Sequence, residues 1–278
     1  SKPRLSPDYG WQFSIDRVEN ASSCRQDASF GTANGTTERH CLRDKRREIF
    51  SVSDETIQSF EITPEHLEHL ALFPLPGAVF FPGTMLPLHI FEPRYREMTR
   101  EALEDGIPIC VVKLKDPREL DAKGRPAFHD IGGAGFLLHH QQLPDGRYNI
   151  LLEGNSRVRI LEEIDSSRSY RVGRAEIIPD KVDLTGSVNA LMTTLRGCVV
   201  GLRNEYERLS EALAKAMNNV ADPGILANSI ASIIIASPDT RQELLCEPRV
   251  DARLDAIVTM LTDLLANSAP ADGDTWLN

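Results

Sequence analysis

Two kinds of reactive site depend on short glycine-containing strings that are easily found in a sequence. A phosphate-binding loop needs GxxxxGK[ST], and a serine nucleophile on a sharp turn needs GxSxG. Neither string occurs in the 278 residues, whose nearest approach to Gly-Lys is the reversed pair Lys123-Gly124. Ser229 and Ser232 have apolar neighbours, and Lys181 and Lys215 lie in no recognisable serine–lysine dyad. We therefore expect a protein that is not an enzyme and has no catalytic residues.

Histidines and carboxylates are the next candidates, as metal ligands or general acids. His66 and His69 are three residues apart, whereas the metallopeptidase pattern HExxH needs histidines four apart on one helix face. His139 and His140 are adjacent in a predicted strand, where successive side chains point to opposite faces. The many carboxylates are not paired within apolar runs, where burial would raise a pKa. We expect neither a metal site nor a cofactor.

Charge and cysteine content limit the class of protein further. The 41 acidic and 31 basic residues give a net charge of −10, which disfavours general binding to nucleic acid or anionic membranes. The longest apolar runs, such as 233–236, are far shorter than the roughly 20 residues of a membrane span, and the first residues lack a signal-peptide pattern. Five cysteines without a CxxC pair indicate reduced thiols, with Cys110 and Cys198 in apolar runs. We expect a soluble cytoplasmic protein.

Composition divides the chain into four segments. Residues 1–64 are rich in Ser, Thr, Asn and Gly without an apolar period, which predicts a disordered or poorly ordered tail. The basic cluster at 43–47 is either a solvated part of this tail or a targeting or nucleic-acid patch. We expect a β-rich domain at 65–182, a helical bundle at 183–267 and a loose tail at 268–278.

The β-rich segment owes its character to apolar runs separated by prolines. Such runs predict short, bent or edge strands; they lie at 70–75, 79–81 and 86–90. A helix is expected from Pro93 to Gly106, with Phe91 and Tyr95 anchoring it to the sheet. Asp145-Gly146 between the apolar runs 135–141 and 147–153 predicts a hairpin.

The last third of the sequence has a helical apolar period. Apolar residues at three- and four-residue steps from Leu191 to Met217 predict one helix of about eight turns. Asp222-Pro223 is expected to start a second helix, Ser237-Pro238 a short third, and a last one covers 250–265. The fold class is therefore α+β, a β-rich domain followed by a C-terminal helical bundle.

A series of ordered motifs extends from about residue 68 to residue 266. They are the string PLPGAVFFPGTMLPLHIFEPRY at 74–95, Ile131-Gly132-Gly133, the hairpin at 143–147, LEGNSRVRI at 152–160, and the segments 222–228, 241–245 and 253–254. Together they resemble the Lon protease amino-terminal (substrate-binding) domain. The resemblance implies a PUA-like pseudo-barrel followed by helices, a domain that full-length Lon joins to an ATPase and a Ser–Lys peptidase.

The resemblance also implies a function. We expect a stand-alone, noncatalytic protein that binds unfolded or client polypeptides, including as an adaptor for a separate ATP-dependent protease. The alternatives are a peptidase-related protein acting with a separate Lon-type protease, and a PUA-like RNA-binding module. The 14 basic and 18 acidic residues within 65–180 disfavour RNA.

The predicted helix at 92–104 carries the candidate binding residues. With Tyr95, Met98 and Ala102 inward, Arg94, Glu97 and Glu101 share an outer face at i, i+3 and i+7. In the resembling domain this region engages unfolded substrate, which makes these three residues the expected substrate-binding set. The alternative interpretation is a solvated helix face. Two other surfaces also stay open, the sheet edge at 74–90 and the groove between the two domains.

Overall fold

The computed structural model describes residues 61–268 except 117, 122, 183–185 and 203–205. All of these residues belong to one compact unit, Gln58–Asn278. The tail expected at 1–64 lies outside the described residues except for its last four, where Thr63 caps helix α2 (Pro64–Glu68). The basic cluster at 43–47 also lies outside them, as does the tail expected at 268–278 apart from Ser268.

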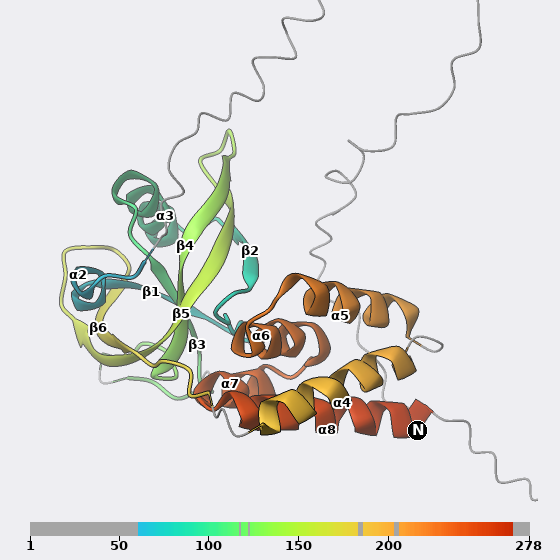
Figure 1. Ribbon diagram of the computed structural model, residues 1–278. Helices are drawn as coiled ribbons and strands as arrows, with labels where there is room; N and C mark the ends of the chain where they lie inside the picture. The colour runs from blue at the N-terminus through green and yellow to red at the C-terminus, as the bar shows by residue number, and fades with distance from the viewer. Residues whose placement is uncertain (1–60, 117, 122, 183–185, 203–205, 269–278) are drawn as a thin grey trace, which may run out of the picture. The chain divides into compact units, whose positions relative to one another are not determined.

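Six strands and seven helices make up the described part of the chain, which confirms the α+β class (Figure 1). After α2 come β1 (Leu70–Leu75), β2 (Met85–Ile90), α3 (Pro93–Asp105), β3 (Ile109–Lys113), β4 (Ile131–Gln142), β5 (Tyr148–Ile164) and β6 (Arg171–Ile177). They are followed by α4 (Ser187–Gly201), α5 (Glu207–Asn219), α6 (Pro223–Ile234), α7 (Pro238–Cys246) and α8 (Val250–Ser268).

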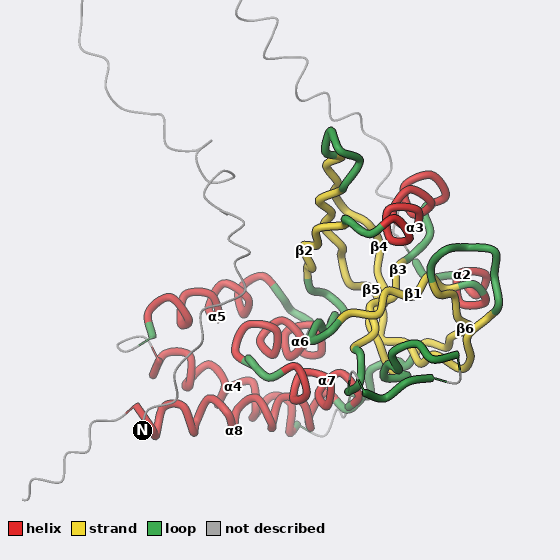
Figure 2. Tube along the Cα trace, turned by 180° about the vertical axis from the view of Figure 1, so that it is seen from behind, coloured by secondary structure: helices red, strands yellow, loops and turns green. Residues whose placement is uncertain are grey.

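The strands form one sheet in the order β2-β5-β4-β3-β1-β6, and β5 also pairs with β6. This extra pairing closes β5, β4, β3, β1 and β6 into a barrel and leaves β2 attached to β5 only. The 17-residue β5 pairs with β2 through its first half and with β6 through its second half, and a register shift lies between Ile160 and Glu162. Bulges of this kind bend a long strand enough for both pairings. Figure 2 shows β2 at the margin of the sheet.

The predicted hairpin is confirmed and is joined to α3. Gly146 has φ of 80°, a left-handed conformation that glycine adopts without strain, and its N–H donates to the Leu143 carbonyl at 2.9 Å. A Cβ atom at Gly146 would lie 2.1 Å from Nη2 of Arg96 on α3. The left-handed conformation is what favours glycine in this turn, since the end of the flexible Arg96 side chain could move away from a Cβ atom.

The segment 79–81, predicted as a strand, is instead a buried loop. Phe80 packs into the strand core with Tyr95 and Leu152, whereas Phe81 packs into the helical core. The Phe80 carbonyl lies so close to Gly133 that a Cβ there would be 1.8 Å away. The apolar run reflects burial of two adjacent rings in two different cores and not strand pairing.

The helix expected from Leu191 to Met217 is divided in two, so the prediction of one long helix was wrong. The Ser210 hydroxyl in α5 donates to the Val199 carbonyl in α4 at 2.9 Å, so the two helices lie side by side. Both halves keep the same apolar period because both bury one face in the same core. The later helix starts are confirmed, because Asp222 and Ser237 accept the backbone N–H of Ile225 and Thr240.

Candidate binding surface at the start of helix α3

Helix α3 is positioned by an apolar face and two terminal residues. Pro93 occupies its first turn and Gly106 ends it in the left-handed conformation, as the sequence predicts. Tyr95 and Met98 are buried against the sheet, and the Tyr95 ring centroid lies 4.3 Å from that of Phe73. Burial raises the pKa of Tyr95. The outer, charged side of the helix, which adjoins this buried face, therefore has a fixed direction.

Arg94 stands at the start of that outer face. Its side chain is 50% exposed, and Nη2 lies 2.7 Å from the Glu92 carboxylate. The guanidinium carbon lies 4.6 Å from the Tyr95 ring centroid, a cation–π distance. The ring and the carboxylate together orient a charged group that remains accessible to a ligand.

Glu97 and Glu101 hold a neighbouring segment in place. Both oxygens of Glu97 accept from Ser169, one from the hydroxyl at 2.7 Å and one from the backbone N–H at 3.3 Å, and these bonds lower the pKa of Glu97. Glu101 accepts from the Tyr170 hydroxyl at 2.7 Å and pairs with Arg168 at 3.0 Å. The three predicted residues lie along one side of α3, but two of them connect it to the segment before β6.

A cavity of about 280 Å³ opens beside Arg94. Its walls come from the first turn of α3, from residues 123–126, and from residues 163–172 at the end of β5 and the start of β6. Arg125 and Arg171 both pair with Asp121 and Glu163, and the Arg171 guanidinium also lies 4.4 Å from the centroid of the Phe128 ring. Sequence reasoning missed this cavity because the walls named here are separated by up to 78 residues, from Arg94 to Val172, and share no local pattern.

Exposed apolar side chains lie along β2 and on the residue that follows it. Alternation along β2 and the residue after it places Met85, Pro87 and Phe91 on one face, with Leu86 and Ile90 on the other. We call Met85, Pro87 and Phe91 the β2 stripe; Met85 is 50% and Phe91 59% exposed. The prediction that Phe91 anchors α3 to the sheet was therefore wrong. Pro87 fits a strand that pairs on one side only.

The junction between strands and helices is held by charge. Asp180 contacts Nη1 of Arg157 at 2.7 Å and both terminal nitrogens of Arg253, at 2.8 and 2.5 Å. The Gln242 side-chain amide donates to the Ile131 carbonyl at 2.8 Å across the same boundary. A cavity of about 210 Å³ lies beside this cluster. The groove considered from sequence therefore contains both these structural contacts and an open cavity.

His66, one of the histidines considered as a metal ligand, has a structural role. The His66 side chain accepts from the Thr63 backbone N–H and so completes the cap of α2. Within the described ranges no group of three His, Cys, Asp or Glu residues could hold a metal ion. In the same part of the chain no helix is long and apolar enough to cross a membrane.

Comparison with known proteins identifies the class of protein to which this fold and these ordered motifs belong. The chain belongs to the family of the ATP-dependent protease La (LON) substrate-binding domain, whose model matches residues 69–263. The Lon protease of Paraburkholderia phytofirmans is 29% identical over 215 residues, which are 75% of this chain and 26% of that protein. The Lon protease of Dictyoglomus thermophilum is 25% identical over 199 residues, covering 70% and 24%. The chain thus spans about a quarter of the length of the curated relatives that it matches.

Solved structures support the fold. The N-terminal domain of the Mycobacterium avium complex Lon protease matches with a TM-score of 0.57 at 15% identity, covering 70% of this chain and 99% of that one. A Lon N-terminal domain protein from Xanthomonas campestris matches with a TM-score of 0.50 at 23% identity, covering 69% and 97%. These likenesses agree with the PUA-like architecture expected from the sequence.

Proposed function

We propose that this domain binds unfolded or client polypeptides without cleaving them. The docking surface is the β2 stripe together with the first turn of α3. The observation that carries the proposal is the exposure of Met85 on β2 and of Phe91 directly after it, three residues before the half-exposed Arg94. Apolar surface with charge at its margin suits an extended chain, because side chains supply affinity and charge sets orientation.

The three sequence-predicted residues have different parts in this proposal. Arg94 contacts the client directly. Glu97 and Glu101 support the surface indirectly, by holding residues 168–170 against α3. Membership of the Lon substrate-binding family supports a role in substrate capture. We extend the proposal to delivery of clients to a separate ATP-dependent protease, in the cytoplasm.

Titration of the full chain with fluorescently labelled, reduced and alkylated α-lactalbumin tests the proposal. Phe91→Ser should weaken binding at least about tenfold, since burying a phenylalanine side chain contributes about 1.5–3 kcal/mol. Leu161→Ser is the matched control, because Leu161 is 50% exposed, close to the 59% of Phe91, but lies where β5 pairs with β6. Equal weakening by both substitutions, or no saturable binding by the unaltered chain, would overturn the proposal.

A further inference from the structure

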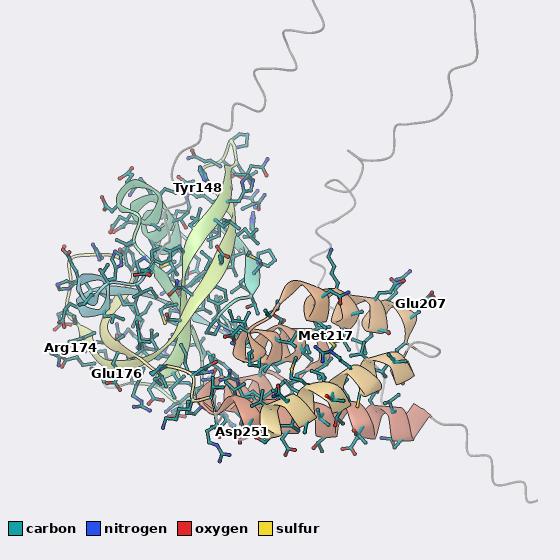
Figure 3. The ribbon with its side chains drawn as sticks, viewed as in Figure 1. Tyr148, Arg174, Glu176, Glu207, Met217 and Asp251 are labelled. Carbon is teal, nitrogen blue, oxygen red and sulfur yellow. The ribbon has the colours of Figure 1, made fainter. Side chains whose placement is uncertain are left out.

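The cavity of about 210 Å³ beside Asp180 lies where the strands meet the helices. Its walls come from Pro82, from residues 155–157 and 177–180, and from the first two turns of α6. Ile177 is the last residue of β6 and follows Glu176, which is labelled in Figure 3. Ile177 is 40% and Ile225 37% exposed, so apolar side chains at the rim are accessible to solvent.

Two side chains that line this cavity each carry a buried polar atom without a partner. These atoms are Nη2 of Arg157 and Oδ1 of Asn228, and neither has a hydrogen-bond partner within the described part of the chain. Both residues are only 1% exposed. Because a buried polar atom is normally hydrogen-bonded, a donor and an acceptor left over in one cavity indicate a ligand that offers the opposite pair.

The remaining polar atoms of both side chains are held in place. The Nε of Arg157 donates to the Leu245 carbonyl, and its Nη1 donates to Asp180 at 2.7 Å. The Nδ2 of Asn228 donates to the Pro82 carbonyl at 3.1 Å, which fixes the orientation of the amide and leaves Oδ1 as the free acceptor. The donor and the acceptor are therefore positioned before a ligand arrives.

Charge and geometry limit the chemistry of that ligand. The lining holds one cation, Arg157, and two carboxylates, Asp180 and Asp222, and Asp180 also pairs with Arg253, so these charges balance. A carboxylate offers only acceptors to Asn228, and an ammonium offers only donors to Arg157. A primary amide carries both kinds of atom side by side at one end, whereas the C=O and N–H of a trans peptide bond point in opposite directions.

We propose that this cavity binds the side-chain amide of a glutamine in the client polypeptide. The amide oxygen accepts from Nη2 of Arg157, the amide nitrogen donates to Oδ1 of Asn228, and the two methylene groups pass the apolar rim. A volume of about 210 Å³ is below the roughly 300–1,000 Å³ of small-molecule pockets, so the cavity fits one side chain and not a length of chain.

The inference rests on the proposed function and adds a second contact to it. Pro82 on the wall of the cavity precedes Met85 of the β2 stripe by three positions. The Gly83 N–H between them donates to the Gly154 carbonyl on β5 at 2.8 Å. The cavity is therefore adjacent to the start of β2, and Arg94 follows its other end. An extended chain that lies along the β2 stripe can place a glutamine side chain in the cavity.

Three fluorescein-labelled twelve-residue peptides test the inference by anisotropy on the full chain. Each consists of Gly, Ser, Leu and Phe with an amidated end, and the central residue is Gln, Glu or Met. Met matches the length of Gln without an amide. We expect the Gln peptide to bind about tenfold more tightly than the other two, a difference of about 1.4 kcal/mol.

The possible results separate this inference from the proposed function. Equal affinity for the Gln and Met peptides would show that only water serves the two buried atoms, and it would overturn the inference while polypeptide binding stands. Tightest binding of the Glu peptide would also overturn it. If no peptide binds but α-lactalbumin binds saturably, the inference fails alone, and if neither binds, both proposals fail.

A pair of buried amides locates the effect. Asn228→Ala should abolish the preference for Gln and leave the Met peptide bound as before. Gln242→Ala is the matched control, because Gln242 is 3% exposed and donates to the Ile131 carbonyl at 2.8 Å but does not line the cavity. Each variant loses one buried hydrogen bond of the same kind, so only the cavity distinguishes them.

A pair of exposed isoleucines repeats the test if Asn228→Ala does not fold. Ile177→Trp places a larger side chain at the rim and should also abolish the preference. Ile233→Trp is its control, because Ile233 is 39% exposed, close to the 40% of Ile177, and lies on α6 outside the lining. A preference that survives in Asn228→Ala and Ile177→Trp, or that is equally lost in the two controls, would overturn the inference.

Discussion

Removal of the Asp180 carboxylate should destabilise the whole described unit. Asp180 is the shared partner of Arg157 on β5 and Arg253 on α8, and both arginine side chains are only 1% exposed. The Arg157 Nε also donates to the Leu245 carbonyl, so its guanidinium is held between strands and helices. In Asp180→Ala both cations lose their counter-charge and stay buried.

The expected loss follows from that burial. Breaking a buried ion pair by removing one partner costs about 3–5 kcal/mol, because the remaining charge is uncompensated. Asp180 itself is 31% exposed, so water can reach part of the vacated position. We therefore expect a loss near the lower limit, about 3 kcal/mol, out of a typical total of 5–15 kcal/mol.

Urea unfolding followed by circular dichroism at pH 7 measures this loss. The control is Glu176→Ala, which removes an exposed pair with Arg159 at 3.0 Å and should cost less than about 1 kcal/mol. A loss in Asp180→Ala no larger than in the control would refute the reasoning. Two separate transitions in the variant would show that the junction couples the strands to the helices.

Three further outcomes are expected. Tyr95→Ala should cost about 3–5 kcal/mol of unfolding free energy, and Phe91→Ala less than about 1 kcal/mol, since Tyr95 is buried and Phe91 exposed; equal losses would contradict the assigned faces. Burial opposes ionisation of Asp180, but hydrogen bonds from Arg253 and Arg157 outweigh it and lower its pKa. The stabilisation by this carboxylate is present above the unfolded pKa of about 3.9 and is lost as pH falls through the lower, folded pKa. The difference in unfolding free energy between the unaltered chain and Asp180→Ala should therefore shrink below about pH 4. A difference that stays constant with pH would contradict this. Purified protein should neither hydrolyse ATP nor degrade casein, and ATP-stimulated proteolysis surviving purification would contradict that.

Local chemistry made part of the fold predictable. The left-handed glycines at 106 and 146, and the capping residues Asp222 and Ser237, act on backbone within a few positions of themselves. Such signals are readable because cause and effect are adjacent in the sequence. The segment 79–81 was not predictable in this way, because an apolar run is the same whether it pairs as a strand or fills two cores as a loop.

The candidate site shows the limit of periodicity. The helical period places Arg94, Glu97 and Glu101 on one side of α3, and the structure agrees with that placement. It does not reveal that Ser169 and Tyr170, about 70 residues away, donate hydrogen bonds to Glu97 and Glu101. A periodic pattern identifies the face a side chain is on, whereas its partner depends on which distant segment the tertiary fold brings there.

Amide hydrogen exchange of the full chain, with and without saturating reduced and alkylated α-lactalbumin, tests client binding at this surface most directly. We predict slower exchange in peptides covering 85–96, from β2 into the first turn of α3, and in those covering 165–172 at the cavity beside Arg94. Peptides from α4, α5, α7 and α8 should exchange as in the unbound chain. Protection confined to the helices, with 85–96 unchanged, would contradict the account and assign the client surface to the helical part.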